Sequence, residues 1–487
     1  MKKILLTVIL LSLGFATSLQ SQQKRYFTGS LLNDSAYVQI PQKPVLLTRS
    51  YDVLPQSHSL RQYCPSTKDQ GPYGTCASWA TAYAARTISE AIANNWIESL
   101  QITRETFSPL FIYSLAKKGN DSRCQTGVYL GAAFEILKMR GVAKYRDFNF
   151  DCSSSASIPG ELHVKARSYT IDNYFALFSG TDPYSKKIST TKKSIAENRP
   201  VVISMEIFNS FQKDNEKVWS GIRDVSGGYH AMCVVAYDDN KYGGSFLLMN
   251  SWGPKWGIDG FKWIRYTDFN QYVNYAMEMY VRKKNVSESS QPKPTPKPEP
   301  VPPIPIQSEL VDLAGELYFV LSTGQKIRPN LRIVNNTSYY VLEGSYISGT
   351  RYRLYLSNNE PAYVYVIGSD LKNSVTKVFP PNDRISAALV YKSNDIAIPD
   401  EKWYIEMDNT KGKDYICVLY SKDELPINNI VRKIKAESGS FFEKVNKALI
   451  YDIIPARAIK YDASTIKFSV GNTNKIVVPI IVEIDHQ

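Results

Sequence analysis

The sequence predicts an α+β protein with two domains joined by a proline-rich linker. Residues 52–285 mix segments of helical periodicity with strand-like runs. Residues 308–487 are rich in short strand-like runs and contain one helical insert. Between them, residues 291–306 contain eight prolines and read Gln-Pro-Lys-Pro-Thr-Pro-Lys-Pro-Glu-Pro-Val-Pro-Pro-Ile-Pro-Ile. The chain therefore divides into a mixed domain, a linker and a β-rich α+β domain.

The composition bounds the class of protein. The chain has 487 residues, of which 43% are hydrophobic and 21% are charged. These fractions exclude a wholly disordered chain and a protein with many membrane spans. Six cysteines are too few for a small disulfide scaffold. The net charge of +12 comes from scattered Lys and Arg with no run of five, which favours a solvated basic surface over a nucleic-acid site.

The first residues are typical of an export signal. Two lysines precede an apolar run from Ile4 to Ala16, and small residues offer cleavage after Ser18 or near Ser21. The run is shorter than the roughly 20 apolar residues that span a bilayer, and no later stretch is long and apolar enough. We expect a signal peptide at 1–21, a short N-terminal segment at 22–51, and a protein in the periplasm, on the cell surface or outside the cell.

The linker, assigned to residues 286–307, has proline at about every second position. Proline removes the backbone donor and fixes φ, so helix and sheet are blocked and a polyproline II rod is favoured. At about 3.1 Å per residue the rod could separate the two domains by up to about 50 Å.

The second domain, at residues 308–487, shows no catalytic group of residues, and we expect a β-rich accessory or binding domain. The expected strands are Thr350–Leu356, Ala362–Ile367, Tyr415–Tyr420 and Lys475–Ile484, and the expected helices are Ile430–Ala436 and Phe441–Leu449.

A cysteine stands where a helix is expected to begin. A turn rich in Gly and Pro precedes Cys76, and Ala80, Ala84 and Ile88 follow at helical spacing. The positive end of a helix favours a thiolate, which is the nucleophilic form of cysteine. Gln70 lies on the turn, where its amide and the backbone N–H of Cys76 could stabilise an oxyanion. A lone cysteine is more often inert packing, so further residues must support this reading.

A histidine and an asparagine lie near two downstream strand-like runs. His230 starts the run that continues to Tyr237, and Asn250 follows the run Phe246–Met249. If the two strands are adjacent and antiparallel, the two side chains lie side by side. Asn250 could then fix the imidazole and leave its other nitrogen facing Cys76.

At these residues the sequence resembles the papain family of cysteine peptidases over about residues 52–281. Gln70 and Cys76, His230, and the run Asn250-Ser251-Trp252-Gly253 match the family's motifs in order. The resemblance implies a two-lobed fold, with a helical lobe and an antiparallel β-barrel lobe. It also implies that Cys76 is the nucleophile, His230 the general base, Asn250 its orienting partner and Gln70 the oxyanion donor.

Further roles come from the same resemblance. It implies that Gly127, Tyr129 and Gly228 bind substrate and that Trp252 lines the site and shields the His–Asn hydrogen bond. It also implies a disulfide between Cys124 and Cys152. Cys233 and Cys417, which lie in strand-like runs, are expected to be buried packing residues.

The sequence departs from the family pattern in several places. The residues before the nucleophile are Tyr73-Gly74-Thr75, so the family's usual first cysteine is missing, and the pattern is closer to that of bacterial members. Thr126 replaces the first glycine of the substrate-binding loop. Residues 22–51 are too short for the long helical inhibitory propeptide of eukaryotic members, so latency by that route is not expected.

These features together predict an exported cysteine endopeptidase that acts on peptides or proteins. Two alternatives are a cell-wall peptide amidase and a non-catalytic binding protein on a protease fold. No cofactor, metal or nucleic-acid partner is expected. We expect a monomer, with possible cell-surface attachment through the C-terminal domain, which is similar to a domain of unknown function found in bacterial surface and exported proteins.

Overall fold

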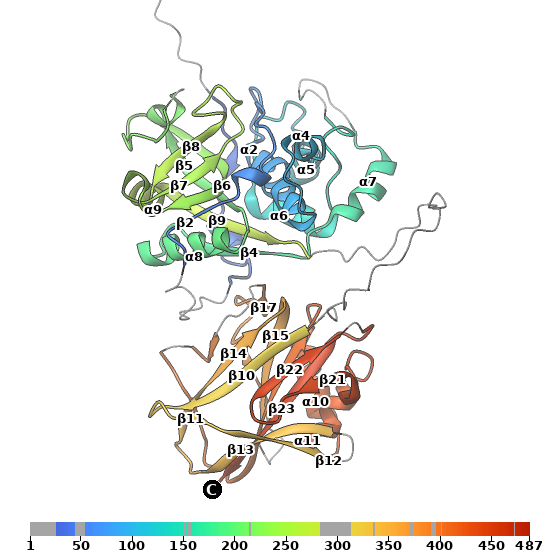
Figure 1. Ribbon diagram of the computed structural model, residues 1–487. Coiled ribbons are helices and arrows are strands. Elements are labelled where there is room, and N and C mark those ends of the chain that lie inside the picture. Colours follow the sequence, from blue (N-terminus) through green and yellow to red (C-terminus); the bar gives the residue numbers. More distant parts are fainter. Residues whose placement is uncertain are drawn as a thin grey trace, which may run out of the picture.

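The protein is described by a computed structural model in which two regions lie one above the other (Figure 1). The expected signal peptide and linker lie outside the described residues. We refer to residues 26–282 as the N-terminal region and to residues 313–487 as the C-terminal region. The described residues are 26–43, 54–149, 152, 157–213, 216–282, 313–334, 337–370, 374–390, 396–400, 402–471 and 473–487.

The helical lobe of the N-terminal region is built around one continuous helical run that starts at Cys76. The run comprises α2 (Cys76–Ser78), a π-helical stretch (Trp79–Arg86) and α3 (Thr87–Ala93). Ala80, Ala84 and Ile88 are buried along it, which confirms the predicted helix, although its middle winds more widely than an α-helix. The surrounding helices are α4 (Ser99–Arg104), α5 (Pro109–Ala116), α6 (Leu130–Met139) and α7 (Gly160–Ala166).

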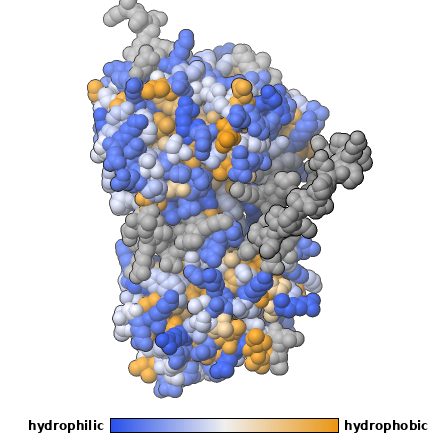
Figure 2. Space-filling view, viewed as in Figure 1, coloured by the Kyte–Doolittle hydropathy of each residue, from blue (hydrophilic) through white to orange (hydrophobic). Residues whose placement is uncertain are grey.

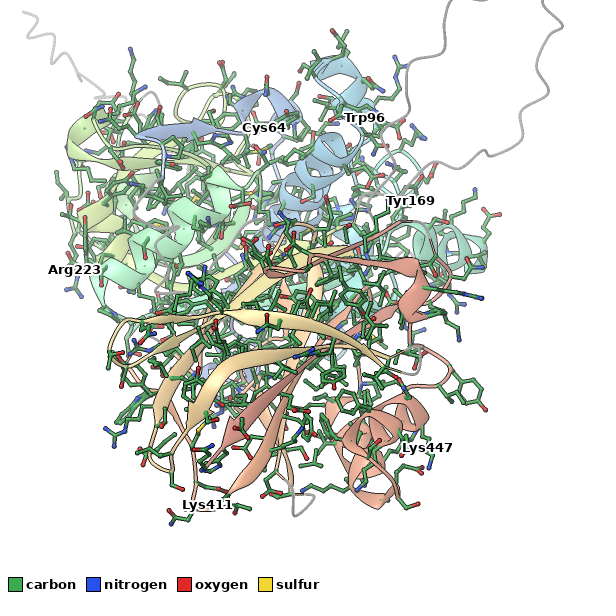
Figure 3. The ribbon with its side chains drawn as sticks, turned by 60° about the horizontal axis from the view of Figure 1, so that its bottom comes forward. Cys64, Trp96, Tyr169, Arg223, Lys411 and Lys447 are labelled. Atoms are coloured by element: carbon green, nitrogen blue, oxygen red, sulfur yellow. A yellow bond between two sulfur atoms is a disulfide. The ribbon has the colours of Figure 1, made fainter. Side chains whose placement is uncertain are left out.

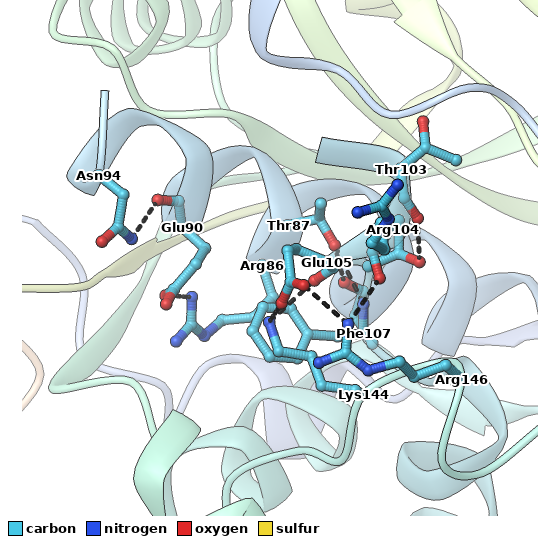
Figure 4. Close-up of polar contacts among 12 residues, drawn as sticks. Arg86, Thr87, Glu90, Asn94, Thr103, Arg104, Glu105, Phe107, Lys144 and Arg146 are labelled. Atoms are coloured by element: carbon cyan, nitrogen blue, oxygen red, sulfur yellow. Dashed lines mark hydrogen bonds and ion pairs between the residues drawn. The ribbon is translucent and has the colours of Figure 1, made fainter. Parts of the chain in front are cut away.

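A polar network fixes the far end of this helical run (Figure 4). Arg86 donates to Glu90 at 2.6 Å, and its guanidinium lies 4.6 Å from the centre of the Phe107 ring. The buried ammonium of Lys144 lies 4.0 Å from the centre of the same ring and 3.2 Å from the Glu105 carboxylate. The helix that begins at Cys76 is thus held to the lobe through an aromatic ring that both cations contact.

The β lobe is a seven-stranded sheet in which every pair of neighbours is antiparallel. β6 begins at Ser226, four residues before the expected start at His230, because Gly228 continues the pairing with β5. α8 (Tyr184–Ala196) and α9 (Tyr266–Tyr272) belong to this lobe. The strand order is β4 (Asn173–Ser179), β9 (Val273–Tyr280), β5 (Val201–Phe208), β6 (Ser226–Asp238), β7 (Ser245–Met249) and β8 (Phe261–Arg265), with β2 (Ser57–Ser59) paired to β6.

Residues 26–43, which we call the strap, precede both lobes in the sequence and contact both. The strap contains β1 (Ser30–Leu31) and the short helix α1 (Asp34–Tyr37). β1 pairs in parallel with β3 (Val128–Tyr129) of the helical lobe. The Tyr37 hydroxyl donates to the carbonyl oxygens of Phe178 and Ala276 in the β lobe, at 2.7 and 2.8 Å.

The C-terminal region contains two seven-stranded sheets and the helices α10 (Ile427–Ala436) and α11 (Phe441–Ala448). Figure 3 shows side chains filling the space between the sheets, with Lys447 on α11 beside them. Each strand and helix expected here is present, and Cys417 is fully buried in β20. The strands are β10 (Leu313–Leu321), β11 (Lys326–Ile327), β12 (Pro329–Val334), β13 (Thr337–Tyr346), β14 (Arg351–Asn358), β15 (Ala362–Ser369), β16 (Val375–Phe379), β17 (Ala388–Leu389), β18 (Ile396–Ile398), β19 (Ile405–Glu406), β20 (Gly412–Ser421), β21 (Ile459–Tyr461), β22 (Ile466–Val470) and β23 (Val477–His486).

The surface is mixed in character. The face shown in Figure 2 is mostly hydrophilic, and its hydrophobic residues form small separate groups. Among the described residues, no helix has the length and apolar character needed to cross a membrane.

We predict that Glu105→Gln lowers the free energy of unfolding by about 1–2 kcal/mol, because Lys144 and Arg146 lose a charged hydrogen-bond acceptor. Burial raises the Glu105 pKa, but the hydrogen bond from Arg146 and the attraction of Lys144 outweigh it and leave the pKa lowered. A carboxylate with a lowered folded-state pKa stabilises the protein above the unfolded pKa, and this contribution is lost as pH falls through the folded pKa. Urea unfolding of wild type and Glu105→Gln at pH 7 measures the loss of stability, and the same comparison at pH 4 measures how far that difference shrinks as Glu105 becomes protonated.

The control for this prediction is the exposed Glu98→Gln, which should unfold as the wild type does. Equal stability of Glu105→Gln and wild type at pH 7 would contradict the role given to the network.

Candidate active site

Cys76 lies at the contact between the two lobes. It is the first residue of the helical run, and its side chain is fully buried. The run packs against β6, and the backbone of Ala231 on β6 lies close enough to the sulfur to lower the pKa of the thiol. The residue that immediately follows His230 is therefore in contact with the predicted nucleophile.

His230 and Asn250 are joined by a hydrogen bond. β6 and β7 are adjacent and antiparallel, with Cys233 opposite Met249, and the His230 Nε2–Asn250 Oδ1 distance is 2.7 Å. Asn250 Oδ1 also accepts from the Ser251 backbone N–H at 2.7 Å, which identifies it as the oxygen. His230 Nε2 is therefore the donor, and a neutral ring carries its lone pair on Nδ1. Within the part of the chain that the structure describes, buried Nδ1 has no hydrogen-bond partner.

Gln70 is oriented by a residue whose role the sequence did not reveal. The Ser251 hydroxyl donates to Gln70 Oε1 at 2.6 Å, and the Gln70 backbone N–H donates to the Ser251 carbonyl at 2.7 Å. Because its oxygen is held by Ser251, the Gln70 amide nitrogen points the other way, toward the carbonyls of Tyr73 and Phe27. The signal for this role was present, since Ser251 lies inside the Asn-Ser-Trp-Gly motif.

The strap covers this group of residues. The Phe27 carbonyl accepts hydrogen bonds from Gln70 Nε2 at 3.4 Å and from Trp252 Nε1 at 3.2 Å. The backbone of Gly29 lies close enough to the Cys76 sulfur to lower the pKa of the thiol. A Cβ added at Gly29 would lie 2.1 Å from the Gly74 carbonyl oxygen, so only glycine fits at this position. The chain therefore places its own backbone across the buried thiol.

The four predicted substrate-binding residues all contact the strap. Gly127 lies against Gly29, Tyr129 pairs with Leu31, and Gly228 lies against Thr28. The Trp252 ring stacks on the rings of His230 and Tyr26, with distances between ring centres of 4.3 Å and 4.6 Å. The groove expected for substrate is filled by an extended segment. Residues 22–51 are too short for a long helical propeptide, but an extended segment of only a few residues is enough to cover these positions.

Burial sets the protonation of Cys76 and His230. Burial raises the Cys76 pKa to about 11, although backbone hydrogen bonds from Ala231 and Gly29 oppose it. Burial also lowers the His230 pKa to about 4, although the hydrogen bond to Asn250 opposes it. Both shifts favour the uncharged form. At pH 7 the covered site therefore holds a neutral thiol and a neutral imidazole.

A disulfide and a carboxylate organise the loop before α6. Cys124 and Cys152 are bonded, as the family resemblance implied. The Asp121 carboxylate accepts from the hydroxyls of Tyr113 at 2.5 Å and Thr126 at 2.8 Å, and Gly127 N–H donates to the Tyr113 hydroxyl at 3.1 Å. Thr126 thus supports the loop where the family has glycine.

The remaining cysteines do not extend the site. Cys64, Cys233 and Cys417 are free and buried, in agreement with the packing role expected for the last two. Among the described residues, no group of three His, Cys, Asp or Glu side chains is placed to hold a metal ion.

Comparison with known proteins gives two family matches. The family described as papain family cysteine protease matches residues 54–282, and a domain of unknown function matches residues 345–424. Both matches confirm the resemblances expected from the sequence.

Individual relatives are distant. The chain is similar to an uncharacterized peptidase C1-like protein of Acanthamoeba polyphaga mimivirus, with 26% identity over 40% of this chain and 62% of the relative. It is also similar to a cathepsin B-like protein of Giardia intestinalis, with 24% identity over 43% of this chain and 68% of the relative. The chain thus spans less than two thirds of the mimivirus protein. Among solved structures, xylellain, a cysteine protease from Xylella fastidiosa, aligns with 19% identity and a TM-score of 0.44 over 54% of this chain and all of its own.

We predict that iodoacetamide modifies Cys76 slowly in the wild-type protein at pH 7, and that Gly29→Ala accelerates the modification at least tenfold. With a pKa of about 11, the covered thiol is almost wholly protonated, and the strap excludes the reagent. The added methyl of Gly29→Ala collides with the Gly74 backbone and displaces the strap. Peptide mass spectrometry, which separates Cys76 from the other free cysteines, measures the rate.

The matched control is Gly160→Ala, because a Cβ at Gly160 meets open space. Equal rates for Gly29→Ala and Gly160→Ala would show that the strap does not protect Cys76.

Proposed function

We propose that this papain-like domain is an exported cysteine endopeptidase, and that the strap holds it in a latent state. One observation carries the proposal. The strap brings a peptide carbonyl of the chain itself, that of Phe27, to Gln70 Nε2 at 3.4 Å, and the backbone of Gly29, two residues on, lies at the covered Cys76 thiol. The same residues would hold the carbonyl of a peptide substrate once the strap has left.

Departure of the strap would change the charge state of the site. Water entering the groove removes the desolvation that keeps Cys76 and His230 neutral. The Cys76 proton can then move to His230 Nδ1. This nitrogen carries the free lone pair, because Nε2 donates its hydrogen to Asn250. The resulting thiolate is stabilised by the helix start and by the adjacent imidazolium.

Peptide hydrolysis then follows in two stages. The Cys76 thiolate attacks the substrate carbonyl carbon and forms a C–S bond. Gln70 Nε2 and the Cys76 N–H donate hydrogen bonds that stabilise the negative charge developing on the carbonyl oxygen. The C–N bond breaks as His230 gives its proton to the leaving amine. His230 next takes a proton from water, which attacks the thioester, and the acid is released with regeneration of the thiol.

The alternative of a non-catalytic binding protein is less well supported. The chain retains the nucleophile, the imidazole, its asparagine partner and the oxyanion amide, and the last three are linked by hydrogen bonds through Asn250 and Ser251. A cell-wall amidase would use similar chemistry on peptidoglycan peptides, so a comparison of protein and peptidoglycan substrates distinguishes it from an endopeptidase.

The proposed activity can be tested with purified mature Gly29→Ala protein and a denatured protein substrate under mild reducing conditions. We expect hydrolysis that Cys76→Ala abolishes and that Gln70→Ala reduces by about 10²–10³-fold, since one oxyanion donor is lost. Fragment mass spectrometry would give the cleaved bonds.

Ser251→Ala refines this test because it removes only the group that orients Gln70. We expect a fall in kcat of about tenfold with little change in KM. The double variant Ser251→Ala/Gln70→Ala should be no slower than Gln70→Ala alone. Two outcomes would overturn the endopeptidase assignment. One is hydrolysis of the protein substrate that survives Cys76→Ala. The other is a Gly29→Ala protein that leaves the protein substrate uncut but cleaves peptidoglycan peptides.

A further inference from the structure

The two ends of the strap lie against different regions of the protein. Its first residues, 26–31, lie over Cys76, as described above. Its last three residues, Pro41–Lys43, lie between the edge strand β4 and residues 384–386 of the C-terminal region. One continuous segment therefore connects the cover of the active site with the C-terminal region.

Hydrogen bonds hold Pro41–Lys43 from both sides. Toward β4, the backbone N–H of Ala176 donates to the Pro41 carbonyl at 3.1 Å, and that of Lys43 donates to the Ala176 carbonyl at 3.4 Å. Toward the C-terminal region, Gln42 N–H donates to the Arg384 carbonyl at 2.7 Å, and Ser386 N–H donates to the Gln42 carbonyl at 2.9 Å. The strap is thus a strand shared by two regions, and half of its pairing at this point comes from the C-terminal region.

Buried charges at the same junction reinforce this arrangement. Lys43 forms an ion pair with Glu278 of β9, which also attracts Arg199 at 3.7 Å. Arg199 in turn donates to the Val390 carbonyl of the C-terminal region. Lys43 is 8% exposed and Glu278 is fully buried. Burial lowers the Lys43 pKa to about 7 although the attraction of Glu278 opposes this shift, and Glu278 and Arg199 connect Lys43 to the C-terminal region.

The rest of the junction shows that the C-terminal region is packed against the N-terminal region and is not merely tethered by the linker. Arg282 pairs with Asp423 at 3.2 Å. Phe175 of β4 and Tyr280 of β9 belong to the buried core of the C-terminal region. The aromatic rings of one region therefore complete the core of the other.

We propose that the C-terminal region, including its domain of unknown function, is a regulatory clamp that keeps the strap over Cys76. This inference rests on the proposed function, because latency has meaning only for an active site. Docking and strap closure are linked equilibria, so each must favour the other by the same factor. Undocking of the C-terminal region would therefore weaken closure of the strap without any change at Cys76 itself.

The clamp can be tested in the full chain with a matched pair of variants at Ser386. Ser386→Pro removes the N–H that donates to Gln42. Ser386→Ala keeps that N–H, and both variants lose the hydroxyl that accepts from the Ala388 N–H, so their difference reports the bond to Gln42. We expect Ser386→Pro to raise the rate of Cys76 alkylation by iodoacetamide about two- to tenfold, the effect of one net backbone hydrogen bond. Ser386→Ala should match the wild type, and thermal unfolding of both variants checks that the fold is kept.

A second pair tests docking away from the strap. Arg282→Ala breaks the contact with Asp423 and should also accelerate alkylation, while Arg351→Ala, which breaks an exposed ion pair within the C-terminal region, should not. If neither Ser386→Pro nor Arg282→Ala exceeds its control, the clamp is refuted. Alkylation reports strap opening without catalysis. Absence of hydrolysis by Gly29→Ala would therefore refute the proposed function separately.

Discussion

The contact between the helical run that begins at Cys76 and strand β6 decides where the reacting groups meet. The run is fixed at its far end by Arg86, Phe107 and Lys144, and at its start by packing on the strand that carries His230. The pairing of β6 with β7 then brings Asn250 to the imidazole, and Ser251 brings Gln70 to the turn before the helix. Each site residue owes its place to this one interface between lobes.

The state of the site follows from its exclusion of water. The proposed reaction requires a charged Cys76 thiolate and a charged His230 imidazolium, but the strap removes the water that both charges need. Cover and protonation are therefore coupled, because the strap lies over Cys76 and the burial of the thiol keeps it in its neutral form. The same burial that would be costly for an ion pair is tolerated because both groups are neutral.

Much of the site was predictable because its residues lie in short motifs with chemical meaning. Cys76 after a Gly/Pro turn and Asn250 before Trp252 are local signals, and both lobes carry the periodicity that their elements need. The strap was not predictable, because its place depends on distant partners: Phe27 meets Trp252, and Tyr37 reaches Ala276. An extended segment without periodicity leaves no signal of what it covers. The junction of Gln42 with Ser386 was hidden for the same reason.

Gly29 has a consequence for the choice of substrates. The strap passes Gly74 so closely that no side chain fits at Gly29, so the residue at this position is set by the close approach of two backbones. A peptide library built on residues 26–31 would copy that constraint and would say little about which side chains the open groove accepts. Cleavage preference must therefore be sought with unbiased peptide mixtures, and a strap-derived peptide is better regarded as a starting point for an inhibitor.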